Sequence, residues 1–386
     1  MAQCKVCGEE YCKKHSFFGA ATKTITEFSG SSPPEIFVGR YNYPNVYAGI
    51  LSPPEYGNTE HLSSAEHWHA SNLAIPDIVK LRNQLIYGRD KTNVKSPTQH
   101  FISVLREVAM THKPIATEFK LKKAVAQNHE HDSHVPLISN AAPLASVRLQ
   151  ENPSVKPKVE YLVNDTQAKA TVSLLELEKA GTQTSTMIKL LSAGLLGKKE
   201  NRKLVPTRWS ITAVDDTLSK EKLKKIRLFP EIKEISLFHA EYLGNHYEFL
   251  LLPDKFAFEV IEIGLNSAGV WHDNEEFEGR KAYASSVTGA YYVNRLALTE
   301  YLEKIQRQAQ CLVLREIRPE YSVPLGVGIL RQVSREAFSK KPEIFATKED
   351  AFQQIQSRLK QPIQNYLAKS VLLKEFGRQA RLAKFF

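Results

Sequence analysis

The chain has 386 residues and carries 52 Lys and Arg against 42 Asp and Glu, which gives a formal net charge of +10. Hydrophobic residues make up 42% and charged residues 24%, a balance that excludes wholesale disorder and a disulfide scaffold. No apolar run approaches the roughly 20 residues needed to span a bilayer, and no secretory signal opens the chain, so we expect a cytoplasmic protein without a membrane partner.

The first 18 residues form a cysteine-rich segment that we expect to be a separate zinc-binding knuckle. Cys4, Cys7, Cys12 and His15 follow the pattern C-x2-C-x4-C-x2-H. Three thiolates and one imidazole are the donors of a tetrahedral structural Zn²⁺ site, whose four filled positions leave none for catalysis. So short a module has no core, so the metal would supply its folding energy. Reduced free thiols or a disulfide are the alternatives.

Aromatic alternation and helical spacing predict the elements of the first half. Arg40–Tyr47 alternates like a strand, with a break at Pro44. Pro76 stands where a first helical turn tolerates proline, and the helix that follows is expected to end by Gly88. Residues 126–158 carry four prolines and predict a long loop or a boundary between domains.

In the second half, helices and strands are mixed without a clean βαβ rhythm. Hydrophobic spacing predicts helices over 172–196 (broken near 181), 289–309 and 348–376, and strands over 209–214, 247–252, 256–265, 311–317 and 325–333. We expect the strands 247–252 and 256–265 to pair with each other. The pattern therefore predicts a mixed α/β (α+β) body over residues 19–376, between the zinc knuckle and a short flexible tail at 377–386.

Positive charge is concentrated in two segments. Residues 198–227 and residues 340–386 each carry ten Lys or Arg against four acids. Clustering of this kind predicts an anionic macromolecular partner, most simply DNA. Two solvated helix faces are the plain alternative.

The stretch around Trp209 is a candidate for nucleotide binding and catalysis. Arg208 would hold a phosphate and Trp209 would stack on a base. Asp215 and Asp216 follow at the carboxyl end of the predicted strand, where ligands bind in α/β sheets, and would be catalytic by holding Mg²⁺ or Mn²⁺. The alternative is that Trp209 belongs to the core and that the carboxylates cap a helix.

A second phosphate-binding candidate precedes the helix expected over 289–309. Arg280 and Lys281 lead through Ser285 and Ser286 to the helix start, where free amides, hydroxyls and cations suit a phosphate. A plain capped helix is the alternative. The segment lacks the G-K-[ST] of a Walker A loop, so it does not predict a P-loop ATPase.

The chain ends in Q-x-x-L-x-x-F-F, formed by Gln379, Leu382, Phe385 and Phe386. At this spacing one tight turn projects the three apolar side chains to one side and leaves the glutamine for a pocket rim. The spacing resembles that of the PIP box, the motif that docks on the sliding clamp PCNA. The alternative is an amphipathic helix end folded back on the body.

Several segments of the interior resemble the archaeal Nre family of DNA repair proteins. They are Gly39–Tyr47, Leu191–Gly197, Lys203–Asp216, Gly279–Tyr283 and Pro324–Val327, and the PTRWSITAVDD run in the third is specific. The resemblance covers nearly the whole chain. It implies a role in the response to DNA damage, recruitment by PCNA, and a place in the archaeal cytosol associated with the nucleoid. It implies no known reaction.

These patterns together predict a DNA repair protein that PCNA recruits through the tail and that binds DNA or a nucleotide through basic residues, Arg40 among them. An alternative is an enzyme, namely a metal-dependent nuclease or phosphoesterase acting on damaged DNA or on a nucleotide adduct. A zinc-containing RNA-binding factor is a third hypothesis, which gives no reason for the terminal Phe pair.

Overall fold

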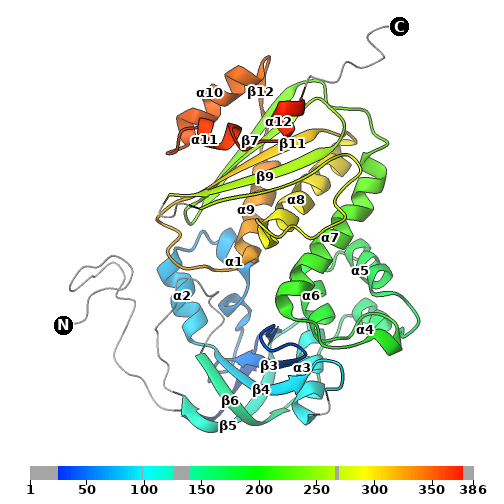
Figure 1. Ribbon diagram of the computed structural model, residues 1–386. Coiled ribbons are helices and arrows are strands. Elements are labelled where there is room, and N and C mark those ends of the chain that lie inside the picture. The colour runs from blue at the N-terminus through cyan, green and yellow to red at the C-terminus, as the bar shows by residue number, and fades with distance from the viewer. Residues whose placement is uncertain (1–24, 98, 126–139, 266–268, 377–386) are drawn as a thin grey trace, which may run out of the picture. The chain divides into compact units, whose positions relative to one another are not determined.

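The computed structural model describes residues 25–97, 99–125, 140–265 and 269–376, and the chain falls into two compact units (Figure 1). Unit 1 comprises residues 1–218 and 322–326, and unit 2 comprises residues 219–321 and 327–386. Each unit combines one sheet with helices, which confirms the mixed α/β class. No helix in the described part of the chain is long and apolar enough to cross a membrane.

Unit 1 is built on a six-stranded sheet with the order β1-β5-β6-β4-β3-β2. Its strands are β1 (Ile25–Ser32), β2 (Ile36–Val38), β3 (Asn45–Ser52), β4 (Ile86–Asn93), β5 (Ile115–Val125) and β6 (Asn140–Leu149). Strands β4 and β6 run parallel, and all other neighbours are antiparallel. In β5 the side chains of Ile115, Thr117 and Phe119 are buried while Ala116 and Glu118 between them are not, so the core lies on one face.

In the described residues of unit 1, nine helical segments belong to it wholly or partly. They are η1 (Glu60–Leu62), α1 (Ala65–Ala70), α2 (Ile75–Asn83), α3 (His100–Met110), α4 (Pro157–Asn164), α5 (Ala170–Lys179), α6 (Thr184–Ser192), η2 (Lys199–Asn201) and the first part of α7 (Thr207–Ile226). Pro76 lies in the first turn of α2, as predicted, because a proline there gives up no helical hydrogen bond. The predicted break near Gly181 is confirmed, since this residue follows α5 with a φ of +71°.

Unit 2 contains a second six-stranded sheet, with the order β10-β9-β11-β8-β7-β12. Its strands are β7 (Ile235–Tyr242), β8 (Asn245–Leu252), β9 (Ala257–Gly264), β10 (Val270–Glu275), β11 (Gln310–Ile317) and β12 (Glu343–Phe345). The strands expected near 247–252, 256–265 and 311–317 are all present. The expected pairing of β8 with β9 is wrong, because β11 lies between them, antiparallel to β8 and parallel to β9.

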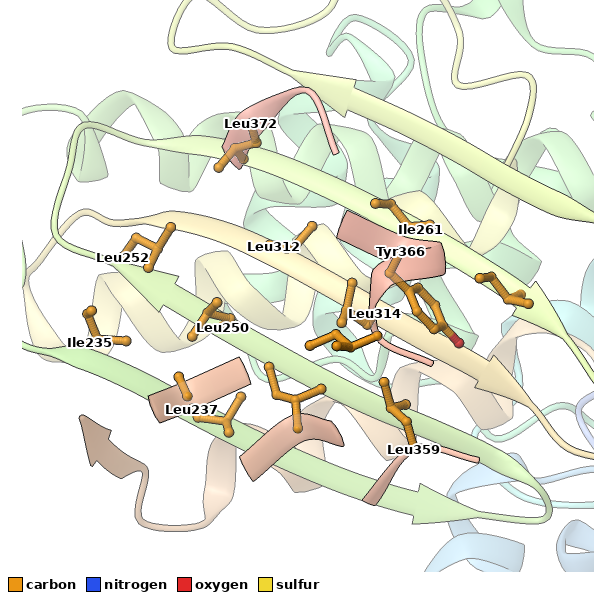
Figure 2. Packing of buried hydrophobic residues seen from close by; sticks show 14 residues of the cluster. Ile235, Leu237, Leu250, Leu252, Ile261, Leu312, Leu314, Leu359, Tyr366 and Leu372 are labelled. Carbon is orange, nitrogen blue, oxygen red and sulfur yellow. The ribbon is translucent and has the colours of Figure 1, made fainter. Parts of the chain in front are cut away.

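Helices cover both faces of the unit 2 sheet (Figure 1). They are α8 (Gly289–Ile305), α9 (Val327–Ser339), α10 (Lys348–Arg358), α11 (Gln364–Leu367) and α12 (Leu372–Glu375), besides the second part of α7. On one face, Leu250, Leu312 and Ile261 of the sheet pack against Leu359 and Tyr366 from the C-terminal segment (Figure 2). On the other face Phe249 contacts Phe338 of α9, with ring centroids 4.8 Å apart.

Two segments predicted as strands are helices. The run 209–214 lies in α7, where Ser210, Val214 and Leu218 are buried at intervals of four residues. The run 325–333 contains the start of α9, whose buried positions Ile329 and Val333 show the same period. In both, β-branched residues gave the appearance of strand alternation, whereas the burial has the helical period.

Two other predictions, both for segments that contain prolines, differ from the structure. The helix expected over 348–376 is divided into α10, α11 and α12, and Pro362 lies in the first interruption because the residues before a proline avoid helical backbone angles. The loop expected over 126–158 contains β6 and the start of α4; β6 includes Pro143, which pairs with Arg89 of β4. Residues 126–139 lie outside the described residues.

Candidate functional site

Two of the predicted sites lie outside the described residues. These are the zinc ligands Cys4, Cys7, Cys12 and His15 and the clamp-binding residues Gln379, Leu382, Phe385 and Phe386. Both therefore stay predictions. The remaining candidates fall in unit 1 (Arg40, Arg208, Trp209, Asp215 and Asp216) and in unit 2 (Arg280, Lys281, Ser285 and Ser286).

In unit 1, strands β2 and β3 form a hairpin whose loop, residues 39–44, carries Arg40, Tyr41 and Tyr43. The loop is closed at its base by a hydrogen bond of 2.8 Å from the Gly39 amide to the Tyr47 carbonyl oxygen. Tyr41 is exposed to 75% and Arg40 lies over its ring, with the guanidinium carbon 5.2 Å from the centroid. The hairpin therefore presents an aromatic ring and a cation together.

The neighbouring strand β4 adds two further cations beside Tyr47 of β3. The guanidinium carbon of Arg89 lies 4.3 Å from the centroid of the Tyr47 ring, and the Lys91 ammonium lies 5.7 Å from it. The register explains this grouping, because Tyr47 is directly opposite Lys91 and Gly49 is directly opposite Arg89. Cross-strand neighbours of this kind share one face of the sheet.

The start of α7 joins the same hairpin and brings Trp209 to it. The Val38 amide donates a hydrogen bond of 2.9 Å to Oγ1 of Thr207, the first residue of α7, and the Ser192 hydroxyl lies 3.1 Å from the same oxygen. Two residues on, the Trp209 ring meets Tyr43, with centroids 5.0 Å apart and planes inclined by 51°. Trp209 is exposed to 43% and Tyr43 to 38%, so the alternative that Trp209 belongs to the core does not hold.

We call these residues the hairpin surface. It consists of Arg40, Tyr41, Tyr43, Tyr47, Arg89, Lys91, Arg208 and Trp209. No acid occurs in residues 39–51 or 202–214, the two segments that supply most of it. Asp90 on β4 is paired with Lys122 at 2.8 Å. Cations that border exposed aromatic rings suit a ligand with phosphates and planar bases.

Not every cation near this surface is available. Arg202 donates three hydrogen bonds of 2.7–2.8 Å to the backbone carbonyl oxygens of Gly197, Val163 and Asp165, so its role is to hold the chain that leads to α7. Arg208, by contrast, is exposed, and among the described residues its side chain makes no hydrogen bond or ion pair. Arg208 can therefore contact a ligand.

Asp215 and Asp216 do not lie at the end of a strand. Both are inside α7, where Asp215 is fully buried and Asp216 is half-buried. Consecutive helical residues point about 100° apart, so the two carboxylates do not share one face. The strand-end placement on which the Mg²⁺ or Mn²⁺ prediction depended is wrong, and a catalytic role for either residue stays a prediction. In the described ranges no group of three or more His, Cys, Asp or Glu side chains is placed to hold a metal ion.

In unit 2 the predicted phosphate loop is already occupied by the Asp273 carboxylate. Its Oδ2 accepts hydrogen bonds from the amides of Ser286 (3.0 Å) and Val287 (2.6 Å), and Arg280 pairs with Oδ1 at 3.0 Å. Arg280 also donates to the backbone carbonyl oxygens of Asn274 in β10 and of Ala282 and Tyr283 in the loop. Lys281 and Ser285 are exposed. The donors before α8 thus bind an acid of the protein itself.

Unit 2 also buries pairs of opposite charges. Arg295 of α8 and Glu275 of β10 are almost fully buried and lie 2.9 Å apart. Arg315 of β11 pairs with Glu262 of β9 at 2.7 Å. Burial alone lowers the pKa of Arg315, but the Glu262 carboxylate outweighs it and raises that pKa above its usual value. Each pair joins neighbouring elements, so the loss of one partner would leave the opposite charge buried without it.

The two basic segments carry less free charge than their composition suggests. In 198–227, Lys222 and Lys225 both pair with Glu303, at 3.1 and 2.7 Å. In the described part of 340–386, Arg358 binds Glu248 and Glu343, at 2.8 and 2.6 Å. Lys222, Lys225 and Arg358 thus form ion pairs within unit 2.

Sequence reasoning found Arg40, Arg208 and Trp209 but missed Tyr43, Tyr47 and the β4 cations Arg89 and Lys91. One signal was available, because tyrosines recur at 41, 43 and 47 in a segment without acids. The contribution of β4 depends on strand register, which the local sequence does not reveal.

Two family models together match nearly the whole chain. The family model described as archaeal Nre, N-terminal, matches residues 6–272, and that described as archaeal Nre, C-terminal, matches residues 275–385. The chain is similar to DNA repair protein NreB of Archaeoglobus fulgidus, with 33% identity over 98% of this chain and 97% of the relative. It is also similar to DNA repair protein NreA of the same organism (32% identity, 100% and 98%) and of Haloferax volcanii (34% identity, 80% and 77%). No solved structure matches the chain significantly.

Proposed function

The chain belongs to the archaeal Nre family, and on this basis we propose that it is a DNA repair protein that is recruited by the sliding clamp PCNA and binds DNA. The observation that carries the proposal is similarity over nearly the whole length to relatives named DNA repair proteins. Both family models contribute, so the similarity extends through unit 1 and unit 2 alike.

DNA binding is supported by the hairpin surface of unit 1. Its cations can contact phosphates, and Arg40, Arg89 and Arg208 each supply N–H donors in a planar array that matches phosphate oxygens. A net charge of +10 on the whole chain favours approach to a polyanion. Binding through such contacts weakens as salt rises, because each neutralised phosphate releases counterions.

Recruitment by PCNA is supported by the spacing of the last eight residues. Leu382, Phe385 and Phe386 are three apolar anchors in a Q-x-x-L-x-x-F-F pattern, with Arg381 and Lys384 between them. A short helical peptide with such anchors binds an apolar groove through the anchors and leaves the intervening residues in water. A tail of this kind would bind the clamp with micromolar strength, roughly −8 kcal/mol.

A structural zinc ion in the N-terminal segment completes the proposal. Three cysteine thiolates and one histidine are a donor set that fits tetrahedral zinc, and Cys4, Cys7, Cys12 and His15 stand at the close spacing of such knuckles. Bound there, the ion supplies folding energy to a segment too short for a core of its own.

Calorimetric titration of the full chain against the archaeal clamp tests the recruitment. We expect Phe385→Ala combined with Phe386→Ala to abolish binding, while Arg381→Ala combined with Lys384→Ala leaves the dissociation constant within a few-fold of the parent. The thermal unfolding of the body should be the same in all three proteins. A double Phe variant that binds the clamp as the parent does would refute the assignment of the tail.

A further inference from the structure

We propose that the hairpin surface is a stacking site for unpaired bases, so that single-stranded DNA is its preferred ligand. This deepens the proposed function and rests on it, because it names the form of DNA that this surface takes. The argument depends on the rings of Tyr43 and Trp209, on the cations beside Tyr41 and Tyr47, and on the backbone that holds both sets.

The ring pair is unusual for a protein surface. Trp209 and Tyr43 touch each other, yet about two-fifths of each side chain remains in solvent, and Tyr41 nearby is three-quarters exposed. Exposed aromatic rings that gather on the hairpin and the adjoining start of α7 mark a binding surface, because exposed apolar side chains on other surfaces are scattered singly. The planar faces of nucleobases are the natural partners of such rings.

The cations select a ligand that also carries negative charge. Arg40, Arg89 and Lys91 each lie within 6 Å of a tyrosine ring centroid, at 5.2, 4.3 and 5.7 Å. A guanidinium held over a ring keeps N–H donors that can reach a phosphate. A base against the ring and a phosphate against the cation are separated by only the sugar of one nucleotide, so the two recognition elements match one strand of nucleic acid.

A duplex fits this surface less well than a single strand. In double-stranded DNA each base is covered on both faces by its neighbours in the stack, and a protein reads it through the groove edges instead. Aromatic rings gain stacking energy only from bases that have left the stack. A surface that combines three exposed rings with cations is therefore matched to unpaired bases, which occur where a helix is opened or damaged.

The backbone beneath the rings is fixed before any ligand arrives. Four backbone donors tie the hairpin and its neighbours together, namely Gly39 to Tyr47 (2.8 Å), Val38 to Thr207 Oγ1 (2.9 Å), Val94 to Pro44 (3.0 Å) and Leu204 to Val94 (3.0 Å). A pre-organised surface loses little conformational freedom on binding. The rings are thus presented without a prior rearrangement of this part of unit 1.

Fluorescence anisotropy with the full chain tests the proposal. The probes are a labelled mixed-sequence 20-nucleotide DNA strand, the same strand in a duplex, and the RNA strand of equal sequence, at the same two salt concentrations. We expect the DNA strand to bind at least about tenfold more tightly than the duplex. We expect Tyr43→Ala and Trp209→Ala each to weaken single-strand binding by roughly 5-fold to 150-fold, with little effect on the duplex.

Three further variants separate stacking from folding and charge. Trp209→Phe should keep most of the affinity, because it keeps a ring. Tyr41→Ala removes a three-quarters exposed side chain, so it tests the surface even if Trp209→Ala fails to fold. Tyr161→Ala is the control, because it removes an aromatic residue of unit 1 that is 64% exposed and outside the hairpin surface. It should leave the affinity for the DNA strand and for the duplex unchanged.

The outcomes distinguish this inference from the proposed function. A duplex that binds as tightly as the single strand, or alanine variants that bind the strand like the parent, would overturn the stacking site and leave DNA binding intact. Tighter binding of the RNA strand would overturn the choice of DNA. A parent protein that binds none of the three probes would refute DNA binding itself.

Discussion

Glu259 on β9 and His272 on β10 are joined by a hydrogen bond of 2.6 Å between Oε1 and Nε2. The carboxylate is fully buried, and it also accepts from the Ser370 hydroxyl (2.5 Å) and from the amides of Val371 (2.8 Å) and Leu372 (3.3 Å). One acid in the sheet therefore holds the last described helix, α12, which begins at Leu372. Because several donors converge on this one carboxylate, it ties β9 both to β10 and to the start of α12.

Replacing Glu259 should destabilise unit 2. Glu259→Ala leaves buried hydroxyl and amide donors without an acceptor, and we expect the free energy of unfolding to fall by about 3 kcal/mol. Urea unfolding followed by circular dichroism measures the change. Glu278→Ala, an exposed acid in the loop after β10, is the matched control and should stay within about 0.5 kcal/mol of the parent. Equal midpoints for Glu259→Ala and the control would contradict this role.

The buried pair Arg295–Glu275 should behave as a coupled unit. Arg295→Met or Glu275→Leu alone breaks the ion pair and leaves the opposite charge buried, and each is expected to cost about 3–5 kcal/mol of unfolding free energy. The double variant should cost less than the two singles together, since it removes both buried charges at once. A double-mutant cycle from urea unfolding measures the coupling.

The exposed pair Lys179–Glu176, at 3.1 Å, provides the control cycle for the buried pair. Its coupling should be no more than about 0.5 kcal/mol, because water screens both partners. If the buried cycle gave a coupling as small as the exposed one, the pair would not act as a unit.

The Glu303 carboxylate should make the stability of unit 2 depend on pH. Partial burial alone raises the pKa of Glu303, but hydrogen bonds from Lys225 and Lys222 outweigh burial and lower that pKa below its usual value. A lowered folded-state pKa stabilises the fold above the unfolded Glu pKa of about 4.3, and this contribution is lost as the pH falls through the folded value. Glu303→Gln should therefore cost about 0.5–1 kcal/mol at neutral pH and nothing in strong acid.

Thermal unfolding at pH 7 and at about pH 3 measures this difference. Glu234→Gln, which changes an exposed acid just before β7, is the control and should match the parent at both pH values. A Glu303→Gln effect that persists unchanged in acid would show that the loss does not come from the ionised pair.

Zinc content tests the N-terminal prediction directly. We expect the purified full chain to carry one zinc ion, measured by inductively coupled plasma mass spectrometry, and Cys12→Ser to lose it, because three remaining donors hold zinc far less tightly. Cys311→Ser is the matched control: Cys311 is fully buried in β11, where burial raises the pKa of its thiol, so it should not bind metal. A parent chain without zinc, or a Cys12→Ser variant that retains it, would reject the knuckle.

The sequence predicted elements well where a single period dominates. Helix α8 and strand β11 appear close to their expected bounds, because the apolar spacing of each matches one period throughout. It failed at α7, where Trp209, Ile211 and Val214 imitate a strand although the run belongs to a helix of 20 residues. Local propensity was outweighed there by packing.

The candidate site was also predicted only in part. Arg208 and Trp209 could be chosen from residue type alone, since each is suited to phosphate or base contact. That Trp209 meets Tyr43, and that Arg89 lies over Tyr47, follows from long-range packing and from strand register. Neither is encoded within a short window of sequence, so neither was predicted.

The position of β11 between β8 and β9 also affects how the chain is made. Strands β8 and β9 are synthesised well before residues 310–317, which form β11. At a synthesis rate of about 5–20 residues per second, β11 follows them after several seconds. During that interval each nascent strand lacks the neighbour that will cover one of its hydrogen-bonding edges. Until β11 is made, the nascent chain therefore carries an incomplete sheet whose open edges are exposed to wrong pairing, and protection by a chaperone would reduce that risk.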